Sequence, residues 1–559
     1  MQLEIQQADP AAATALGQAL GVSGATAQIL LHRGLTDEGA ARAYLTPRLS
    51  ELTSPDAMAD RDLAADRLAH AVRSRERIAV FGDYDVDGTT SAAILAGILE
   101  QLGGQVVLLL ASRFEGGYGL SDDALDRLLQ TAPQLLVTCD CGSSDHPRIA
   151  RARARGVDVI VVDHHLVPTE PLPALAFLNP HRPDCGFAYK GLCSAGLALS
   201  LGAAVRARLG VALDLRTWLD LVALGTIADV APLDGDNRRL VRAGLSLLAS
   251  GRARPGVVAL RELAKIPGGA PLGAHDVAFR MTPRLNAAGR LGDPTLTLSL
   301  LRARDLPEAR ALAARIEQIN EQRKLVEAEV TQQAIDQVLA IYGEAPAGGI
   351  VAAAEGWHRG VLGISAARLC DRFDVPAVVI ALDGGVGHGS GRAPDGFALF
   401  DAIARCAPEL ERYGGHQAAA GLALRADRLE AFRSQFATAT ANRSGAVEQK
   451  PTRVDVVVGG EGGYPMPPAA DLARLEPLGE ANAEPVFLVT DARVESSSVV
   501  GRGHLKLKLR AGGVQLSGFG RDMGSRLPEV GRSIAAVGAL YPDSWIGGEQ
   551  VELRLLDFE

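Results

Sequence analysis

Acidic and imidazole side chains follow several apolar segments of this sequence, where they could hold metal ions. The segment 78–81 leads into three aspartates at alternate positions, and a glycine and a run of hydroxyl residues come after them. Burial would raise the pKa of such crowded carboxyl groups, and bound cations would relieve their repulsion. Taken alone, this stretch is equally well explained as a solvated acidic turn that caps a helix. The candidate ligands of the whole chain are Asp83, Asp85, Asp87, Asp140, Asp163, His164, His165 and Asp229.

The segments around these residues predict an α/β domain built on a parallel sheet. Apolar runs at 78–81, 106–110, 135–137 and 157–162 alternate with amphipathic segments, a pattern typical of strands that are buried on both faces. Ligands of such sheets bind at the carboxyl ends of the strands. Three of the four runs end in candidate ligands, so we expect these side chains to lie close together.

The mixture of side chains indicates which ions would bind. Carboxylates with one or two imidazoles favour Mg²⁺ or Mn²⁺, and none of the six cysteines forms a CxxC pair that would suggest structural zinc. The carboxylates outnumber what a single ion needs. Two ions that share a bridging aspartate would use them all, and this arrangement serves phosphoester hydrolysis.

Composition sets broad limits on the class of protein. A chain of 559 residues corresponds to about three or four domains. The sequence has no apolar run long enough for a membrane helix, no signal peptide and no disulfide-like cysteine spacing, so we expect a cytoplasmic protein. A net charge of −9 argues against general coating of nucleic acid, but it leaves room for a local basic channel.

The second half of the sequence predicts a long helix, a second α/β unit and a small β-barrel. Residues 305–343 lack glycine and proline between Glu308 and Tyr342, which favours a connector helix over a coiled-coil dimer seam. Glycine-rich turns at 387–392 and 413–421 could approach an anion closely, although most such turns only reverse the chain. Short strands after residue 450 predict the barrel. One of these β-strands carries a charged face formed by His504, Lys506, Lys508 and Arg510. This face suits either a groove that binds single-stranded nucleic acid or a charged strand that protects the edge of a β-sheet.

Several motifs together resemble the DHH phosphoesterase superfamily and, within it, the RecJ family of single-strand-specific 5′→3′ DNA exonucleases. The superfamily motifs are Asp85-Val86-Asp87-Gly88, Asp140 and Asp163-His164-His165. Flanking motifs of the narrower family stand at 80–88, 113–120, 281–292 and 356–364. The resemblance covers nearly the whole chain in the same order. It implies a catalytic DHH domain, a DHH-associated domain and a C-terminal OB-fold.

The resemblance also implies roles for individual residues. Asp85 and Asp140 would hold one ion, and Asp87, Asp140, His164 and Asp229 would hold the other, while Asp83 would either be a further ligand or orient its neighbours. His165 would contact the scissile phosphate, and Asp163 would orient an imidazole. The implied substrate-binding residues are Arg113, Arg284, Asn286, Arg290, His358, Ser390, Arg392, His416, Lys506 and Lys508.

The sequence therefore predicts an exonuclease that uses two Mn²⁺ or Mg²⁺ ions, releases nucleoside 5′-monophosphates and serves recombination and repair. We expect a monomer that works with a helicase and a single-strand-binding protein. Two alternatives are a DHH phosphodiesterase for short oligonucleotides or cyclic dinucleotides, and a scaffold that only binds single strands. The expected segments are helical at 1–70, catalytic at 71–304, connecting at 305–343, DHH-associated at 344–442 and an OB-fold at 450–559.

Overall fold

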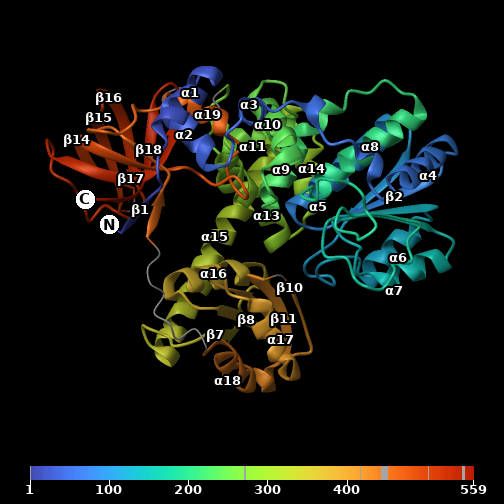
Figure 1. Ribbon diagram of the computed structural model, residues 1–559. Coiled ribbons are helices and arrows are strands. Elements are labelled where there is room, and N and C mark those ends of the chain that lie inside the picture. The colour runs from blue at the N-terminus through green and yellow to red at the C-terminus, as the bar shows by residue number, and fades with distance from the viewer. Residues whose placement is uncertain (1, 270–271, 416, 442–450, 502, 544–547) are drawn as a thin grey trace. The chain divides into compact units, whose positions relative to one another are not determined.

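The computed structural model describes residues 2–269, 272–415, 417–441, 451–501, 503–543 and 548–559 (Figure 1). The chain forms two compact units. The first consists of Met1–Pro283, Thr295–Ala313 and Lys450–Glu559, and the second of Arg284–Pro294 and Ala314–Gln449. The two ends of the chain thus belong to the same unit, although most of the sequence separates them.

A five-stranded parallel sheet carries the predicted ligands. Its strands lie in the order β3 (Gln105–Leu110), β2 (Arg77–Gly82), β4 (Leu135–Cys139), β5 (Asp158–Val162) and β6 (Ala176–Leu178). The helices of this layer are α5 (Val86–Gln101), α6 (Asp122–Gln130), α7 (His146–Ala154) and α8 (Ser194–Leu209). The parallel sheet expected from the sequence is confirmed.

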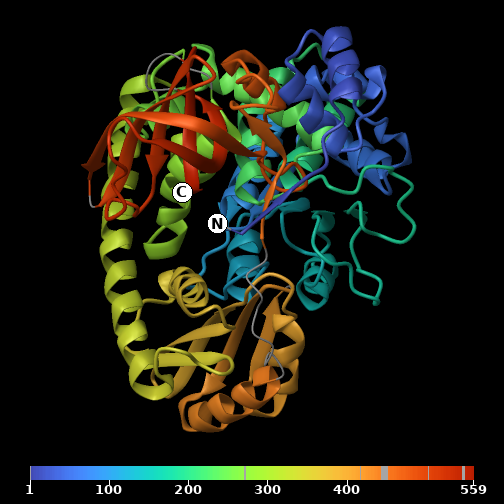
Figure 2. The same cartoon turned by 60° about the vertical axis from the view of Figure 1, so that its left-hand side comes forward.

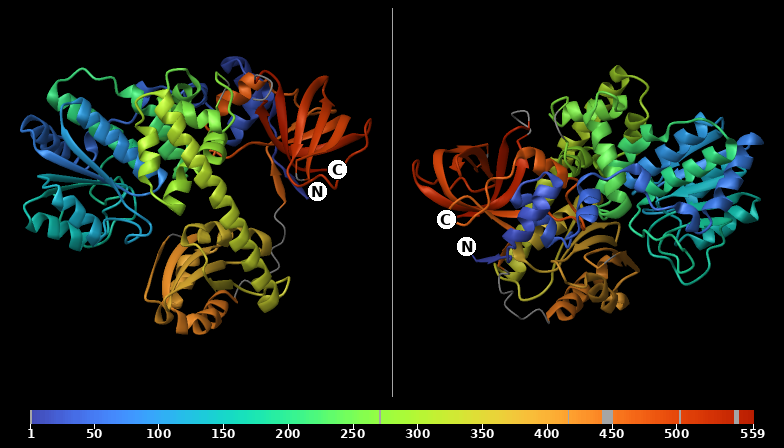
Figure 3. Two further views of the ribbon diagram at one scale, coloured as in Figure 1. Left: turned by 180° about the vertical axis from the view of Figure 1, so that it is seen from behind. Right: turned by 45° about the horizontal axis from the view of Figure 1, so that its top comes forward.

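Helices cover both faces of this sheet (Figure 3). Phe81 of β2 shares a core with Leu125 of α6 and Ile149 of α7. Because side chains alternate along a strand, Val80 points to the opposite face, where α5 packs against β2 and β3 and also contacts α8. Burial on both faces is the reason why the strands read as continuous apolar runs.

Helices that follow the sheet complete the middle of the first unit. The helix α9 is almost wholly buried, and a π-helix, η4, continues directly from α12. The elements of this segment are η3 (Leu215–Trp218), α9 (Leu219–Ala228), α10 (Gly235–Ala249), α11 (Pro255–Leu263), α12 (Ala274–Asp276), η4 (Val277–Met281), α13 (Thr282–Leu291) and α14 (Thr295–Leu301).

A closed β-barrel forms the C-terminal part of the first unit. Its neighbouring strands are β13 (Val456–Val458), β14 (Val486–Val500), β15 (His504–Ala511), β16 (Val514–Gly520), β18 (Val551–Phe558) and β17 (Ser533–Pro542). Pairing of β14 with β17 closes the barrel. Along β15 the leucines are buried while Lys506, Lys508 and Arg510 are exposed, as the alternation in the sequence predicts.

The N-terminal helices pack against this barrel (Figure 1). Leu16 and Ile29 lie in one hydrophobic core with Phe487 and Leu507 of the barrel strands. The strand β1 (Leu3–Ile5) also pairs in parallel with β12 (Thr452–Val454). The elements involved are α1 (Pro10–Leu20), α2 (Gly24–His32), α3 (Glu38–Leu45) and α19 (Ala469–Leu475), and η1 (Leu49–Glu51), η2 (Pro55–Ala57) and α4 (Arg61–Arg73) follow toward the parallel sheet.

The second unit is built on a mixed five-stranded sheet. Its order is β10 (Arg412–Gly415), β11 (Ala419–Arg425), β9 (Val386–Arg392), β8 (Ala377–Asp383) and β7 (Ile350–Glu355), and only β7 and β8 are parallel among these described pairs. Its other elements are α15 (Leu306–Tyr342), η5 (Arg359–Val361), α16 (Leu362–Phe373), α17 (Leu399–Arg405), η6 (Ala407–Glu409), η7 (Ala426–Arg428) and α18 (Leu429–Thr440). The long helix α15, continuous in Figure 2, begins in the first unit and ends in the second.

Two further observations bear on the compositional expectations. Across the described ranges, no helix is long and apolar enough to cross a membrane. The six cysteines all lie within the described residues and are buried thiols that form no disulfide bond.

Candidate metal centre

The strand ends bring the predicted ligands together around the His164 imidazole. Its Nε2 atom lies 3.2 Å from Asp140 Oδ1, 3.7 Å from Asp229 Oδ2 and 3.9 Å from Asp87 Oδ2. Two sets of donors are close enough to share an ion, one formed by Asp140, His164 and His165 and the other by Asp87, His164 and Asp229. Residues from three different strand ends and from α9 therefore converge on one site.

The N-terminus of α8 positions two of these carboxylates. The backbone N–H groups of Ser194 and Ala195 donate to Asp87 Oδ2 and Oδ1 at 2.8 and 3.0 Å, and Ser194 Oγ donates to Asp140 Oδ1 at 3.0 Å. Exposed N–H groups at a helix N-terminus favour negative charge. Gly225 lets α9 approach, because a Cβ there would lie 2.7 Å from Asp87 Oδ1.

Asp140 adopts a backbone conformation that is uncommon for a residue with a side chain. Its φ is 64°, in the left-handed region, while its N–H still donates to the Val162 carbonyl at 2.9 Å. Such outliers cost free energy and persist where the surrounding structure over-determines them, often at functional sites. The turn sends the Asp140 side chain toward His164 at the end of β4.

Asp85 and Asp83 stand at the same strand end but make different contacts. Asp85 caps α5, because its Oδ1 accepts the Gly88 N–H at 2.9 Å. Asp83 is buried, and its Oδ1 accepts the Gly119 N–H at 3.3 Å. Neither belongs to the two donor sets within the described residues. Both remain part of the acidic cluster, since burial and then the Asp85 charge raise the pKa of Asp83.

His165 is held by Asp163 and touched by Tyr118. Asp163 Oδ1 accepts from His165 Nδ1 at 2.8 Å and from the His164 and His165 backbone N–H groups, while its Oδ2 accepts from Ser143. The Tyr118 hydroxyl lies 3.0 Å from His165 Nδ1. Although burial opposes it, the hydrogen bond to Asp163 raises the pKa of His165 to about 9. The imidazole is therefore protonated near neutral pH and can act as a donor.

The electrostatics of the cluster fit divalent cations. Burial, and then neighbouring carboxylates, raise the pKa of Asp87 and Asp140 and raise that of Asp229 to about 9. Burial lowers the pKa of His164, which leaves a neutral ring that can ligate a metal. Its buried Nε2 has no hydrogen-bond partner in the described part of the chain. A cation would supply that partner and offset the repulsion between the carboxylates.

These shifts predict how stability depends on pH in the metal-free protein. Asp229 and His165 both keep a proton in the folded state at pH values where the unfolded chain has lost it, because folding raises both pKa values. The free energy of unfolding should therefore fall as pH rises from 6.5 to about 9. Thermal unfolding in EDTA across this range measures the slope.

Two controls isolate the source of this slope. Asp229→Asn should make it shallower, because one of the two titrating groups is removed. Saturating Mn²⁺ should also flatten it, because ligation keeps the carboxylates ionised in the folded state. A slope that persists unchanged in both conditions would contradict this account of the cluster.

Ser390 and Arg392 lie side by side in the second unit, against the start of α16. They occupy alternate positions of β9, and Arg392 Nη1 donates to Ser390 Oγ at 3.3 Å. A Cβ at Gly363 would lie 3.0 Å from both Arg392 Nη2 and Ser390 Oγ. No described side chain caps the N-terminus of α16. A hydroxyl and a guanidinium beside the N-terminus of a helix form a suitable anion site.

The remaining predicted binding residues are placed as follows. Arg284 forms a two-pronged ion pair with Glu317, with N···O distances of 2.7 and 3.0 Å. Arg290 and His358 meet at Gly360, which receives a hydrogen bond from Arg290 at its carbonyl and donates its N–H to His358. Three of these residues lie in the first unit: Arg113 is stacked over the Tyr84 ring, and Lys506 and Lys508 lie on the barrel. Asn286 is partly exposed on α13, and His416 lies outside the described residues.

Sequence reasoning missed two residues that contact the centre. Ser194 lies in an unremarkable apolar stretch, and its serine type alone gave no indication of contacts with Asp87 and Asp140. Tyr118 belongs to a quoted motif, but its hydroxyl bonds to the Asp140 carbonyl and its contact with His165 depend on the fold. Both contacts join residues that are distant in the sequence.

Comparisons with known proteins agree with this architecture. The chain matches the models of the DHH family N-terminal domain at residues 77–226, the DHHA1 domain at 347–442 and the RecJ OB domain at 467–557. It is 33% identical to the single-stranded-DNA-specific exonuclease RecJ of Bacillus subtilis (strain 168), over 100% of this chain and 70% of that protein.

Two crystal structures of RecJ from Thermus thermophilus are also similar. The complex with Mn²⁺ has a TM-score of 0.80 at 30% identity and covers 100% of this chain and 79% of that chain. The complex with Mg²⁺ has a TM-score of 0.74 at 28% identity, with coverage of 100% and 78%. Three domain models match in order, and the Bacillus subtilis relative is 33% identical over the whole of this chain. The chain therefore belongs to the RecJ family.

Proposed function

We propose that this chain is a metal-dependent exonuclease specific for single-stranded DNA, which digests from the 5′ end and releases nucleoside 5′-monophosphates. The buried cluster around His164 carries the proposal. It combines carboxylates that repel one another with an imidazole nitrogen that has no hydrogen-bond partner among the described residues. The related crystal structures contain Mn²⁺ and Mg²⁺, which are the ions that such oxygen-rich donors favour.

The residues of the cluster can be assigned to two ions. Asp87, His164 and Asp229 would hold one ion together with Asp140, and Asp140 with Asp85 would hold the other. Bound divalent cations activate water at neutral pH and neutralise phosphate oxygens. Within the chain, α8 fixes the orientation of Asp87 and Asp140 through Ser194 and Ala195. Asp83 is assigned to the support of this cluster, because its described contact is the Gly119 N–H.

His165 is assigned to the scissile phosphate. Asp163 holds Nδ1 and keeps the ring protonated, so Nε2 is the donor that would contact a non-bridging oxygen. Negative charge on these oxygens increases as water attacks phosphorus, and a preoriented cationic donor stabilises that state. The Tyr118 hydroxyl also lies 3.0 Å from Nδ1, and the Tyr118 ring meets the imidazole edge to face, which further restricts the orientation of the ring.

The anion site in the second unit supports the proposed polarity. Ser390, Arg392 and the N–H groups at the start of α16 are suited to a terminal 5′-phosphate. Other contacts with the single-stranded DNA are assigned to Arg113, Arg290, Asn286 and His358. Arg284 is assigned to supporting these contacts through its ion pair with Glu317.

The exposed face of β15 is assigned to binding the phosphate backbone of the single-stranded DNA. Lys506 and Lys508 are exposed and lie opposite Ser498 and Ser496 of β14. Replacement of both lysines with alanine should weaken binding of a long single strand and reduce the slope of log K against log salt by about 1.4, the value for two phosphate contacts. Binding titrations over a range of salt concentrations check this.

A matched control separates this effect from general loss of charge. Lys324→Ala removes an exposed lysine from α15, where it pairs with Glu321, and should leave the salt slope unchanged. Equal slopes for the wild type and the double variant would exclude phosphate contacts by these lysines and leave them as solvated charges on a strand that is paired on both sides.

Digestion of end-labelled DNA tests the proposal as a whole. Single-stranded and duplex substrates, labelled at either end, are incubated with the full chain in Mn²⁺, in Mg²⁺ and in EDTA. We expect mononucleotides from the 5′ end of the single strand, and only when a metal is present. Cleavage confined to short oligonucleotides or cyclic dinucleotides would favour another DHH activity. Binding without hydrolysis under any metal would favour a binding scaffold.

We also propose a role in DNA recombination and repair, in which a helicase and a single-strand-binding protein prepare the substrate for a monomeric nuclease in the cytoplasm. The proposed domain division remains 1–70, 71–304, 305–343, 344–442 and 450–559. Packing of α1 and α2 on the barrel assigns the first of these segments a structural role in support of the OB-fold.

A further inference from the structure

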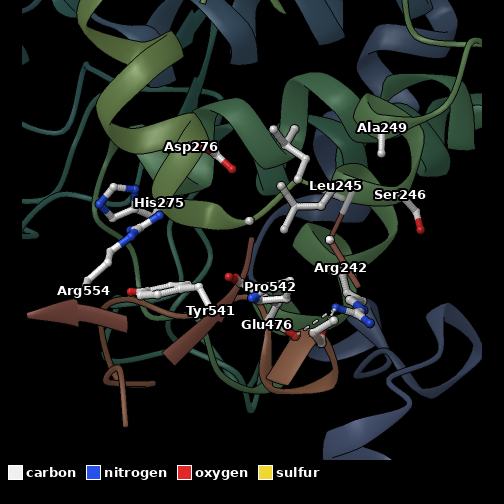
Figure 4. A pocket seen from close by; sticks show the side chains of 14 residues that line it. Arg242, Leu245, Ser246, Ala249, His275, Asp276, Glu476, Tyr541, Pro542 and Arg554 are labelled. Carbon is white, nitrogen blue, oxygen red and sulfur yellow. Dashed lines mark hydrogen bonds between the residues drawn. The ribbon is translucent and has the colours of Figure 1, made fainter. Parts of the chain in front are cut away.

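A small cavity with several charged residues in its walls lies in the first unit, where the barrel meets the helices that follow the parallel sheet (Figure 4). Its volume is about 190 Å³. The helical wall includes Arg242 of α10 and His275 of α12, and the barrel wall includes Tyr541 of β17 and Arg554 of β18. Glu476 closes one side. The cavity is distinct from the metal centre, because it shares no residue with the cluster around His164.

Most charged groups of this cavity are already paired. The Glu476 carboxylate accepts the N–H groups of Ala274 and Leu478 at 3.2 and 2.9 Å. Asp276 accepts from Arg280 at 3.0 Å, and Arg242 donates to the Ala473 carbonyl at 2.7 Å. The walls therefore carry both signs of charge, and buried carboxylates stand beside the cations. Such walls disfavour a free phosphate ion, because its charge would face these carboxylates.

Three buried polar atoms of this cavity lack hydrogen-bond partners. They are His275 Nδ1, the Tyr541 hydroxyl and Arg554 Nη1, which make no hydrogen bond to any residue that the structure describes. The Arg554 guanidinium is fixed, since its central carbon lies 3.9 Å from the centroid of the Tyr541 ring. Burial, and then the Arg554 charge, lower the pKa of His275, which keeps the ring neutral and able to donate or accept. Unpaired buried polar atoms are costly and indicate a missing ligand or water.

An exposed aromatic ring stands next to the cavity. Phe279 is 69% exposed. The ring centroid of His275 lies 4.6 Å from that of Phe279 and 6.3 Å from that of Tyr541. Phe279 belongs to the π-helix η4, a type of segment that occurs often at functional sites. Large exposed aromatic rings beside hydrogen-bonding groups are the usual platform for unpaired bases.

We propose that Phe279 and this cavity bind one nucleobase. The base would stack on Phe279 and turn its polar edge toward Arg554 Nη1 and His275 Nδ1. A neutral heterocycle with both donors and acceptors matches walls of mixed charge better than an anion does. The base belongs to a single strand held away from the metal centre, and in this respect the inference rests on the proposed function. A free nucleotide offers the same chemistry and is the other source to be tested.

The experiment uses the full chain in EDTA, so that binding is measured without hydrolysis. Single-stranded oligonucleotides carry one 2-aminopurine at successive distances from the 5′ end. We expect strong fluorescence change at one position or two adjacent ones. Phe279→Ala and Arg554→Gln should abolish the change there and weaken binding about tenfold, within the range for one stacked base. Leu325→Ala, which truncates an exposed apolar side chain on α15, should alter neither quantity.

Combining Phe279→Ala with an abasic residue in the DNA makes the test sharper. An abasic residue at the sensitive position should weaken binding to the wild type as much as Phe279→Ala weakens binding of the intact strand. Both changes together should cause no further loss, because each removes the same contact. A uniform fluorescence profile along the strand, or additive losses, would overturn the proposal.

Two further measurements distinguish a base within a DNA strand from a free nucleotide, and failure of the base site from failure of the proposed nuclease function. If 2-aminopurine nucleoside 5′-monophosphate binds and Phe279→Ala removes that binding, while no strand position responds, the strand assignment is overturned in favour of a free nucleotide. A nuclease assay in Mn²⁺ is run on the wild type. A chain that binds with position dependence but never hydrolyses DNA refutes the proposed function and leaves the base site standing.

Discussion

Asp140→Asn is expected to reduce hydrolysis of single-stranded DNA by roughly 10³-fold or more, in the range of losses for a central charge-stabilising group. The Asp140 carboxylate lies nearest to His164 Nε2, at 3.2 Å, and is the residue assigned to both ions. Asparagine keeps the size and the Ser194 contact of the side chain but offers no negative charge. Single-turnover cleavage in saturating Mn²⁺ measures the loss.

Binding and stability distinguish a lost metal ligand from a damaged fold. In EDTA the variant should bind a single strand as the wild type does and unfold at the same or a higher temperature, because one of several repelling carboxylates has been neutralised. Mn²⁺ should then raise the unfolding temperature of the wild type more than that of the variant. Asp126→Asn, which removes a carboxylate on the exposed face of α6, provides the matched control. Substantial turnover by Asp140→Asn would exclude its bridging role.

Arg392→Ala is expected to lower kcat/KM by roughly 10- to 100-fold on strands with a 5′-phosphate, the effect of about 1.5–3 kcal/mol for a hydrogen bond to a charged group. Strands with a 5′-hydroxyl should be cut at the rate of the wild type, since they lack the group that the guanidinium binds. The rates of both substrates, measured with both proteins, give the coupling between Arg392 and the phosphate.

Gly363→Ala tests the same site without removing a polar group. Its Cβ would lie 3.0 Å from Arg392 Nη2 and Ser390 Oγ and would occupy the space in front of them. Alanine also favours a helix over glycine, so the variant should be as stable as the wild type while it loses the preference for a 5′-phosphate. Arg372→Ala, at the exposed end of the same helix α16, should change neither property. If both Arg392→Ala and Gly363→Ala retain the preference, the phosphate is bound elsewhere.

The lysines of the barrel and Arg392 should affect different properties of DNA cleavage. Loss of Lys506 and Lys508 should act on long strands and on their salt dependence, whereas loss of Arg392 should act on the 5′ end only. The three sites would thus contribute separable steps, namely capture of the strand, recognition of its end and cleavage. Additive effects of the corresponding variants on binding are expected for groups without shared contacts.

The sequence by itself determined the elements that carry the site and the types of its donors. Buried parallel strands require apolar residues on both faces, so their boundaries are legible as continuous apolar runs, and Asp140 and Asp163 follow two of them directly. Alternation along β15 and the glycine-free span of α15 were predicted for similar local reasons. The family resemblance also depended on short contiguous motifs, which a sequence displays without any knowledge of packing.

Only the tertiary structure decided how these groups meet. The left-handed turn at Asp140, the contacts of Ser194 with Asp87 and Asp140, and the pairing of Arg284 with Glu317 join segments that are distant along the chain. The common core of the N-terminal helices and the C-terminal barrel is of the same kind. Sequence patterns report which face of an element is buried, but they do not report what it is buried against. The cavity beside Phe279 follows from this, since its unpaired atoms arise only where the barrel and the helices meet.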